Sequence, residues 1–188
     1  MPLLDLLNRR FGKNSFTDYS RDDNQDNDET VEISFKNSLP IDSLSQDKCI
    51  DERMVTFLKE LSYDIALERS AQIQYIIHAN EIEGKDILIA EDLLIHADDE
   101  YNHQKILSDR LNYLKSKITT EVGEIKTSDD AEEMLRQDLS GETTAIERYK
   151  IRIQQAKELG DEGTAHILMQ ILTDEEHHEN DLKTYLGV

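Results

Sequence analysis

The 188-residue sequence is poor in cysteine, proline, tryptophan and basic side chains. Its single cysteine, Cys49, excludes an internal disulfide and a four-cysteine metal site, and it suits a reducing compartment. Lys and Arg number 21 against 41 Asp and Glu, and the net charge of −20 opposes binding to nucleic acid or anionic membranes and favours cations. No apolar run could span a bilayer, and the first residues lack the pattern of a secretion signal. We therefore expect a cytoplasmic protein with no nucleic-acid or membrane partner.

The two prolines both lie within the segment 1–50, which differs in character from the rest of the chain. This polar segment has 10 acidic against 6 basic side chains, a net charge of −4, so the rest of the chain carries −16 of the total −20. Too little of it can be buried to offset the entropy lost on ordering, which predicts a flexible extension over residues 1–50. Its apolar stretches, Leu3–Phe11 and Leu39–Leu44, are candidate docking segments for a neighbouring subunit or another partner. Residues 51–188 are expected to form one domain.

Beyond residue 50 the apolar residues recur at the helical period, with no proline and few glycines to interrupt them. Gly84 and Gly160 end two of the predicted helices, and Ser128 is the expected N-cap of a third. The segment 117–128 is longer than an antiparallel neighbour needs, so it can run the length of a bundle and make the second and third helices parallel. The pattern predicts an all-α fold, a four-helix bundle with one long crossover, whose helices span residues 51–83, 86–116, 129–159 and 161–185.

A glutamate interrupts the apolar inward stripe of each predicted helix. In the first hairpin, Glu68 and Glu100 are equally distant in sequence from the turn at Gly84, one before it and one after it. In the second hairpin, Glu142 and Glu175 lie on either side of Gly160 at nearly equal distances. At 1.5 Å per residue, both hairpins place their acids about 22–27 Å from the turn. Four carboxylates are therefore expected to meet in one layer of the core.

Two of these glutamates begin a Glu-x-x-His sequence, Glu100 to His103 and Glu175 to His178. A Glu and a His three residues apart on a helix lie on one face and can bind one metal ion, through a carboxylate oxygen and an imidazole nitrogen. No Lys or Arg is predicted in the layer, and uncompensated burial of four carboxylates would be very unfavourable. Two divalent or trivalent metal ions would neutralise them. The competing interpretation, solvated faces or a stripe misaligned by one position, leaves the coincident heights unexplained.

Other polar residues near the layer are expected to have lesser roles. His96 lies on the inward stripe one turn before Glu100, and we interpret it more readily as a hydrogen-bonded core histidine than as an accessory ligand. Asp138 and His177 flank the layer and are expected to support the ligands or to face solvent. Glu176 and His177 are suggestive by residue type, but they point about 100° or more away from the ligand face.

The segments that carry these residues resemble the ferritin-like superfamily, and within it bacterioferritin and the bacterioferritin-like miniferritins, also called Dps-like proteins. The resemblance covers residues 51–188 and rests on the stretches Glu68–Ala79, Glu100–His103, Glu133–Glu142 and Ile171–His178. It implies a di-iron centre, with manganese as the alternative metal, and it makes Tyr75 a hydrogen-bond donor to a ligand or an electron donor. The ligands that it implies are Glu68 and Glu142 as terminal carboxylates, Glu100 and Glu175 as bridging carboxylates, and His103 and His178 on one iron each.

The sequence departs from these families at three points. Bacterioferritin places a haem-ligating methionine directly after the glutamate of its second helix, whereas this chain has Tyr101, so no haem is predicted. The segment from His178 to Val188 is too short for the fifth helix of the 24-subunit shells, and this favours a 12-subunit shell, with a dimer as the fallback. The single cysteine also leaves no place for the cysteine pair that many Dps-like proteins carry near the metal centre.

The function implied by the resemblance is that of a ferroxidase, which oxidises Fe²⁺ with O₂ or H₂O₂, stores the Fe³⁺ in a protein shell, and removes peroxide under oxidative stress. The alternative is a non-storage di-metal oxidoreductase acting as a dimer: a rubrerythrin-like peroxidase, a manganese catalase or an oxygenase. Rubrerythrins usually carry a four-cysteine module, which one cysteine cannot build. A DNA-coating miniferritin is a third alternative, which the acidic segment 1–50 disfavours.

Overall fold

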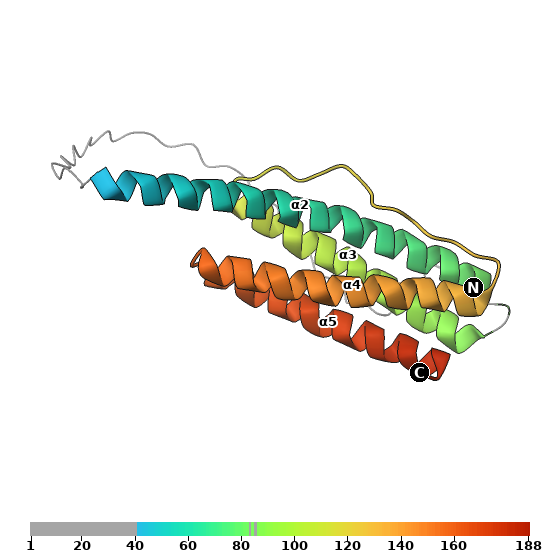
Figure 1. Cartoon of the computed structure of the whole chain (residues 1–188). Coiled ribbons are helices and arrows are strands. Elements are labelled where there is room, and N and C mark those ends of the chain that lie inside the picture. The colour runs from blue at the N-terminus through green and yellow to red at the C-terminus, as the bar shows by residue number, and fades with distance from the viewer. Residues whose placement is uncertain (1–40, 83, 85) are drawn as a thin grey trace, which may run out of the picture. The chain divides into compact units, whose positions relative to one another are not determined.

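The computed structural model describes residues 41–82, 84 and 86–188. Within these residues none of the helices is long and apolar enough to cross a membrane. The predicted docking segment Leu3–Phe11 lies outside the described residues. The described part folds as four helices and contains no strand, which confirms the predicted all-α bundle (Figure 1): α2 (Ile41–Ile82), α3 (Ile87–Tyr113), α4 (Ala131–Glu158) and α5 (Glu162–Leu186).

The first helix, α2, starts at Ile41, well before the predicted position at Asp51. Its sequence holds neither proline nor glycine, so nothing in the backbone chemistry stops the helix near residue 51. A polar composition predicts little burial, but a helix can extend beyond its packed part because each added residue contributes one more backbone hydrogen bond. The predicted extension of residues 1–50 therefore overlaps the start of α2, and its residues 1–40 lie outside the described part.

Aspartate side chains cap the other three helices. Asp86, Asp130 and Asp161 each accept hydrogen bonds from backbone N–H groups in the first turn of α3, α4 and α5. The prediction that Ser128 caps the third predicted helix is wrong, because its hydroxyl accepts instead from the backbone N–H of Asp130, the true N-cap. Gly160 follows the end of α4 as predicted, and its φ of 73° is the left-handed conformation that glycine adopts without strain.

Helices α2 and α3 form one antiparallel hairpin, α4 and α5 form the second, and the two hairpins pack against each other through α2 with α4 and α3 with α5 (Figure 1). The segment between α3 and α4 runs along α2, as Figure 1 shows, so that α3 and α4 are parallel as predicted. Arg69 of α2 donates hydrogen bonds to the carbonyl groups of Thr119 and Glu121 in this crossover. The crossover therefore lies fixed against the bundle.

At Gly123 the backbone of the crossover lies directly against α2. Its N–H donates to the carbonyl of Ala66 at 2.9 Å. A Cβ atom at this position would lie 2.7 Å from the hydroxyl oxygen of Ser70, so a larger residue would require Ser70 or the crossover to shift.

The core consists of two apolar clusters with a polar layer between them. The six residues predicted to form the dinuclear site all lie in this layer, so the bundle is apolar at both ends and charged in the middle. One cluster is built around Phe57, Leu61, Ile65, Leu107, Leu111, Ile153 and Leu168, and the other around Ala79, Ile82, Leu93, Ala97, Met134, Leu135 and Leu182.

Candidate metal centre

One glutamate from each helix and two histidines occupy the layer between the apolar clusters. All six side chains belong to residues that are at most 3% exposed. Their ligand atoms form two groups, and within each group the atoms lie within 4.8 Å of one another. Glu100 and Glu175 belong to both groups. We name the groups after the helix that supplies the unshared glutamate: the α2-side cluster contains Glu68, Glu100, His103 and Glu175, and the α4-side cluster contains Glu100, Glu142, Glu175 and His178.

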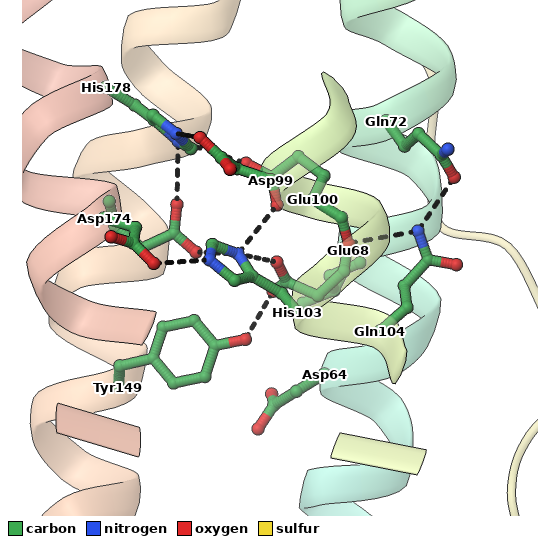
Figure 2. Close-up of polar contacts among 12 residues, drawn as sticks. Asp64, Glu68, Gln72, Asp99, Glu100, His103, Gln104, Tyr149, Asp174 and His178 are labelled. Carbon is green, nitrogen blue, oxygen red and sulfur yellow. Dashed lines mark hydrogen bonds and ion pairs between the residues drawn. The ribbon is translucent and has the colours of Figure 1, made fainter. Parts of the chain in front are cut away.

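In the α2-side cluster the imidazole of His103 faces three carboxylates. Its Nδ1 atom lies 3.4 Å from Glu68 Oε2, 3.3 Å from Glu100 Oε2 and 3.4 Å from Glu175 Oε1. Figure 2 shows the ring of His103 between Glu68, Glu100 and Asp174. One nitrogen and three oxygens thus converge on a common centre.

The α4-side cluster repeats this arrangement around His178. Its Nδ1 atom lies 3.3 Å from Glu100 Oε1, 3.4 Å from Glu175 Oε2 and 3.9 Å from Glu142 Oε1. The two shared glutamates therefore turn one oxygen to each histidine. This is the geometry of a carboxylate that can bridge two metal ions.

The outward nitrogens of both histidines meet aspartates. His103 Nε2 lies 3.3 Å from Asp174 Oδ2, and His178 Nε2 lies 3.4 Å from Asp99 Oδ2. A carboxylate at Nε2 fixes the ring orientation and leaves Nδ1 free for a metal ion. Sequence reasoning missed both aspartates, although each directly precedes a Glu-x-x-His sequence.

Two buried tyrosines bind the unshared glutamates across the bundle. Tyr75 of α2 donates a hydrogen bond from Oη to Glu142 Oε1, as predicted for a tyrosine that hydrogen-bonds a ligand. Tyr149 of α4 donates from Oη to Glu68 Oε1 at 2.6 Å. Sequence reasoning did not single out Tyr149. The signal for both contacts is the spacing, since each tyrosine follows the glutamate of its own helix by two helical turns.

The prediction that no Lys or Arg lies in the layer is wrong. Arg148 Nη2 lies 2.8 Å from Glu68 Oε1, and Arg148 Nε lies 3.2 Å from Asp64 Oδ1. Arg152 Nε lies 2.9 Å from the other oxygen of Asp64, which is fully buried. Position 148 directly precedes the inward Tyr149, and the long arginine side chain reaches the core from there. Asp64, one turn before Glu68 on the same face, was the available signal that a cation was needed.

On the other side of the layer, Asp138 forms part of a buried network that ties down the crossover. It accepts a hydrogen bond from Gln74 Nε2 at 2.8 Å and lies 2.9 Å from His78 Nδ1. Gln74 Oε1 accepts from the backbone N–H of Lys126, and His78 Nε2 lies 3.0 Å from the carbonyl oxygen of the same residue. The solvent-facing role predicted for Asp138 is wrong, because the residue is buried, and its contacts are with Gln74 and His78 rather than with a predicted ligand.

His96 is buried against the α4-side cluster. Its ring stacks on that of His178 with 4.2 Å between centroids and meets the edge of Tyr75 at 5.3 Å. Its Nε2 atom lies 3.5 Å from Asp181 Oδ2, so the predicted core histidine has a long polar contact rather than a short hydrogen bond. Burial, followed by the charge of His178, lowers the pKa of His96 to about 4. His177 faces solvent.

Two of the four carboxylates in the metal-free layer, Glu100 and Glu142, have raised pKa values, whereas the pKa values of Glu68 and Glu175 are lowered. Burial, then the charges of Glu175 and Glu68, raise the pKa of Glu100 to about 8. The pKa of Glu142 is raised for the same two kinds of cause. Burial acts to lower the pKa of His178, but its hydrogen bond to Asp99 and the nearby carboxylates of Glu100 and Glu175 outweigh burial and raise it. Metal binding at this layer must therefore release protons.

The residues present fit two metal ions. Four buried atoms of the layer make no hydrogen bond within the described part of the chain: Glu100 Oε1, both carboxylate oxygens of Glu175, and His178 Nδ1. Buried polar atoms in folded proteins almost always have a partner, so these atoms point to a ligand. Carboxylate oxygens together with imidazole nitrogens suit iron, manganese and zinc.

A model of the ferritin-like domain family matches residues 58–188, a range that includes all six residues of the layer. The chain belongs to the ferritin-like domain family. This match agrees with the resemblance to the ferritin-like superfamily found in the sequence.

Named relatives of this ferritin-like chain are bacterioferritins. The bacterioferritin of Streptomyces coelicolor is 28% identical over 140 residues, which cover 73% of this chain and 82% of the relative. The bacterioferritin of Mycobacterium leprae is 27% identical over 133 residues, which cover 70% and 84%. A solved structure of mycobacterial bacterioferritin superposes with a TM-score of 0.66 at 27% identity and covers 70% of this chain and 83% of that one. The predicted resemblance to bacterioferritin is confirmed.

Proposed function

We propose that this ferritin-like chain is a ferroxidase, which oxidises Fe²⁺ at the buried layer and stores the Fe³⁺ product in a protein shell. The observation that carries the proposal is the geometry of the shared glutamates, Glu100 and Glu175, each of which turns one oxygen to each cluster. Two metal ions bridged in this way can act together on an oxidant that takes two electrons. The bacterioferritin relatives support iron as the metal, with manganese as the alternative.

Each ligand has a part in binding two Fe²⁺ ions as substrate. Asp174 and Asp99 accept hydrogen bonds from the Nε2 atoms of the two histidines and keep Nδ1 turned inward. Tyr75 holds Glu142 in place and is also the side chain placed to donate an electron. The proposed assignments are Glu68 and His103 on one ion, Glu142 and His178 on the other, and Glu100 and Glu175 as bridges.

The redox step conserves atoms and electrons. Two Fe²⁺ ions give up two electrons and become two Fe³⁺ ions. With two protons, these electrons reduce one H₂O₂ to two waters, or one O₂ to H₂O₂. If H₂O₂ is the oxidant, the protein also removes peroxide by converting it to water.

A hollow of about 320 Å³ connects the layer with the surface between α2, α4 and the crossover. It reaches Glu68 and Glu142 at its inner end and is lined further out by Tyr63, Glu124 and Lys126. We assign to it the passage of Fe²⁺ and oxidant to the site. The net charge of −20 favours the approach of cations.

Iron oxidation by purified protein tests the proposal. Wild-type protein is expected to oxidise Fe²⁺ much faster than buffer does, and Glu100→Ala and His178→Ala to lose this acceleration. His177→Ala is the matched control, since this neighbouring histidine faces solvent. Wild-type protein that is no faster than buffer, or ligand variants as fast as wild type, would contradict the ferroxidase assignment.

Assembly separates storage from the alternative function. A 12-subunit shell of 21.7 kDa chains has a native mass of roughly 250 kDa, assuming that no other component binds. A dimer that leaves no iron mineral inside it would instead favour a non-storage oxidoreductase: a rubrerythrin-like peroxidase, a manganese catalase or an oxygenase. Native mass, metal content and a haem spectrum of protein expressed with iron distinguish these outcomes, and we expect no haem because Tyr101 follows Glu100.

A further inference from the structure

The carboxylate of Glu68 is held by one of its oxygens. Oε1 accepts a hydrogen bond from Tyr149 Oη at 2.6 Å and lies 2.8 Å from Arg148 Nη2. Oε2 remains on the inner side, 3.4 Å from His103 Nδ1. Arg148 therefore orients Glu68 and places a permanent positive charge beside a ligand of the α2-side cluster.

Among the described residues, none places such a cation at the α4-side cluster. Arg148 follows Glu142 on α4 at the same spacing at which Gln74 follows Glu68 on α2, so Gln74 holds the corresponding position. Its side chain is neutral and bonds to Asp138 and the Lys126 backbone instead of Glu142. Within the described residues no Lys or Arg forms an ion pair with Glu142.

We propose that Arg148 makes the two metal positions unequal, so that the α4-side position fills first and the α2-side position is the weaker, exchangeable one. The inference rests on the proposed dinuclear site. A cation in contact with Glu68 lowers the negative charge that attracts a metal ion and uses one of the two oxygens of this ligand. At low local dielectric, a charge this close changes binding strongly.

Charged residues farther from the ligands also differ between the α2-side and α4-side clusters. Beyond Arg148, the buried Asp64 is flanked by a second cation, Arg152. The acid at the corresponding position of α4, Asp138, is flanked by an amide and an imidazole. Arg148 is a positioning residue in this account, because it acts on the metal through Glu68.

Stepwise metal binding tests the inference. Metal-free protein is titrated with Co²⁺ and followed by calorimetry and visible absorption. Wild type is expected to bind two ions per subunit, with dissociation constants at least about tenfold apart. Arg148→Gln gives α4 the residue found on α2 and is expected to tighten the weaker step by about tenfold and leave the tighter step unchanged. Arg148→Lys retains a cation and should keep two separate steps.

Ligand variants identify which position is which. Glu68→Ala should remove the weaker step, and the absorption spectrum of its first Co²⁺ should match that of wild type. Glu142→Ala should remove the tighter step. Thermal unfolding checks each variant, and Asp64 keeps its contact with Arg152 when Arg148 is replaced.

The outcomes are distinguishable. Two ions bound with equal affinity by wild type, an unchanged separation in Arg148→Gln, or loss of the tighter step in Glu68→Ala would overturn the inference and leave the dinuclear site intact. If Arg148→Gln does not fold, the wild-type titration and the two ligand variants still decide. Wild type that binds no pair of ions in this layer would overturn both the inference and the proposed function.

Discussion

Glu68 and Tyr75 of α2 recur at the same spacing as Glu142 and Tyr149 of α4, and each tyrosine donates to the glutamate of the other helix. Helices α3 and α5 are related in the same way. There both the Glu-x-x-His pair and the aspartate before it recur, and each aspartate contacts the histidine of the other helix. The two hairpins thus supply matching sets of candidate ligands, and matching hydrogen-bond partners for them, to one layer.

The surroundings of the ligands do not match. Arg148 stands where α2 has Gln74. His96 stacks on His178, and the position corresponding to His96 on α5 is Ile171. Equivalent candidate ligands therefore have neighbours that differ in charge and polarity, and we expect this to make the two proposed metal positions differ.

Among these predictions, removal of a shared glutamate should have the largest effect on metal binding and Fe²⁺ oxidation, because it changes the α2-side and the α4-side cluster at once. Glu100→Ala is expected to abolish binding of two metal ions and to slow Fe²⁺ oxidation by at least about 100-fold. Glu176→Ala, an exposed neighbour of the other shared glutamate, is the control. Metal analysis and oxidation kinetics measure both. A Glu100→Ala variant that still binds two ions per subunit would show that this carboxylate does not bridge them.

Replacing His96 by isoleucine, the residue at the corresponding position of α5, should make the free energy of unfolding less sensitive to acid. The pKa of His96 is about 4 in the folded protein, below its unfolded value near 6.5, so the unfolded chain binds more protons between these values. The free energy of unfolding contributed by this residue therefore falls as pH drops from about 6.5 to 4, by about 3 kcal/mol. His96→Ile should flatten that part of the profile.

Denaturant unfolding of metal-free protein at several pH values measures this effect. His177→Ala, which changes an exposed histidine, should keep the wild-type profile. Equal pH profiles for wild type and His96→Ile would mean that His96 does not stay neutral when buried.

The paired aspartates test whether the two halves respond alike. Asp174→Asn should weaken the metal position that contains His103, and Asp99→Asn the position that contains His178, each by about tenfold. Loss of a residue that hydrogen-bonds a metal ligand usually weakens metal binding by about 10- to 100-fold. We expect the low end of this range because the side chains of Asp174 and Asp99 are 50% and 42% exposed. Co²⁺ titration resolves the two positions. An effect of Asp174→Asn on the His178 position would contradict the pairing.

Much of the fold, and the meeting of the six candidate ligands in one layer, could be predicted from the sequence. Helical periodicity, the two turns and Glu-x-x-His place six side chains at one height, because these features depend on local geometry. Contacts such as that of Arg148 with Glu68 could not be predicted, since a long side chain beside the inward stripe can point to solvent or to the core. The start of α2 was missed because a polar composition predicts little burial and does not exclude a helix.

The tyrosines give the smallest and most specific comparison. In Tyr149→Phe, Glu68 keeps the hydrogen bond from Arg148, whereas in Tyr75→Phe, Glu142 loses the one hydrogen-bond donor that the described residues give its Oε1. Leaving a buried acceptor unsatisfied costs more than losing one of two hydrogen bonds, so Tyr75→Phe should destabilise the metal-free protein by about 1 kcal/mol more than Tyr149→Phe. Denaturant unfolding measures both variants. Equal losses of stability in the two variants would mean that Arg148 does not support Glu68 independently of Tyr149. The surroundings of Glu68 and Glu142 would then be more alike than their neighbouring charges indicate.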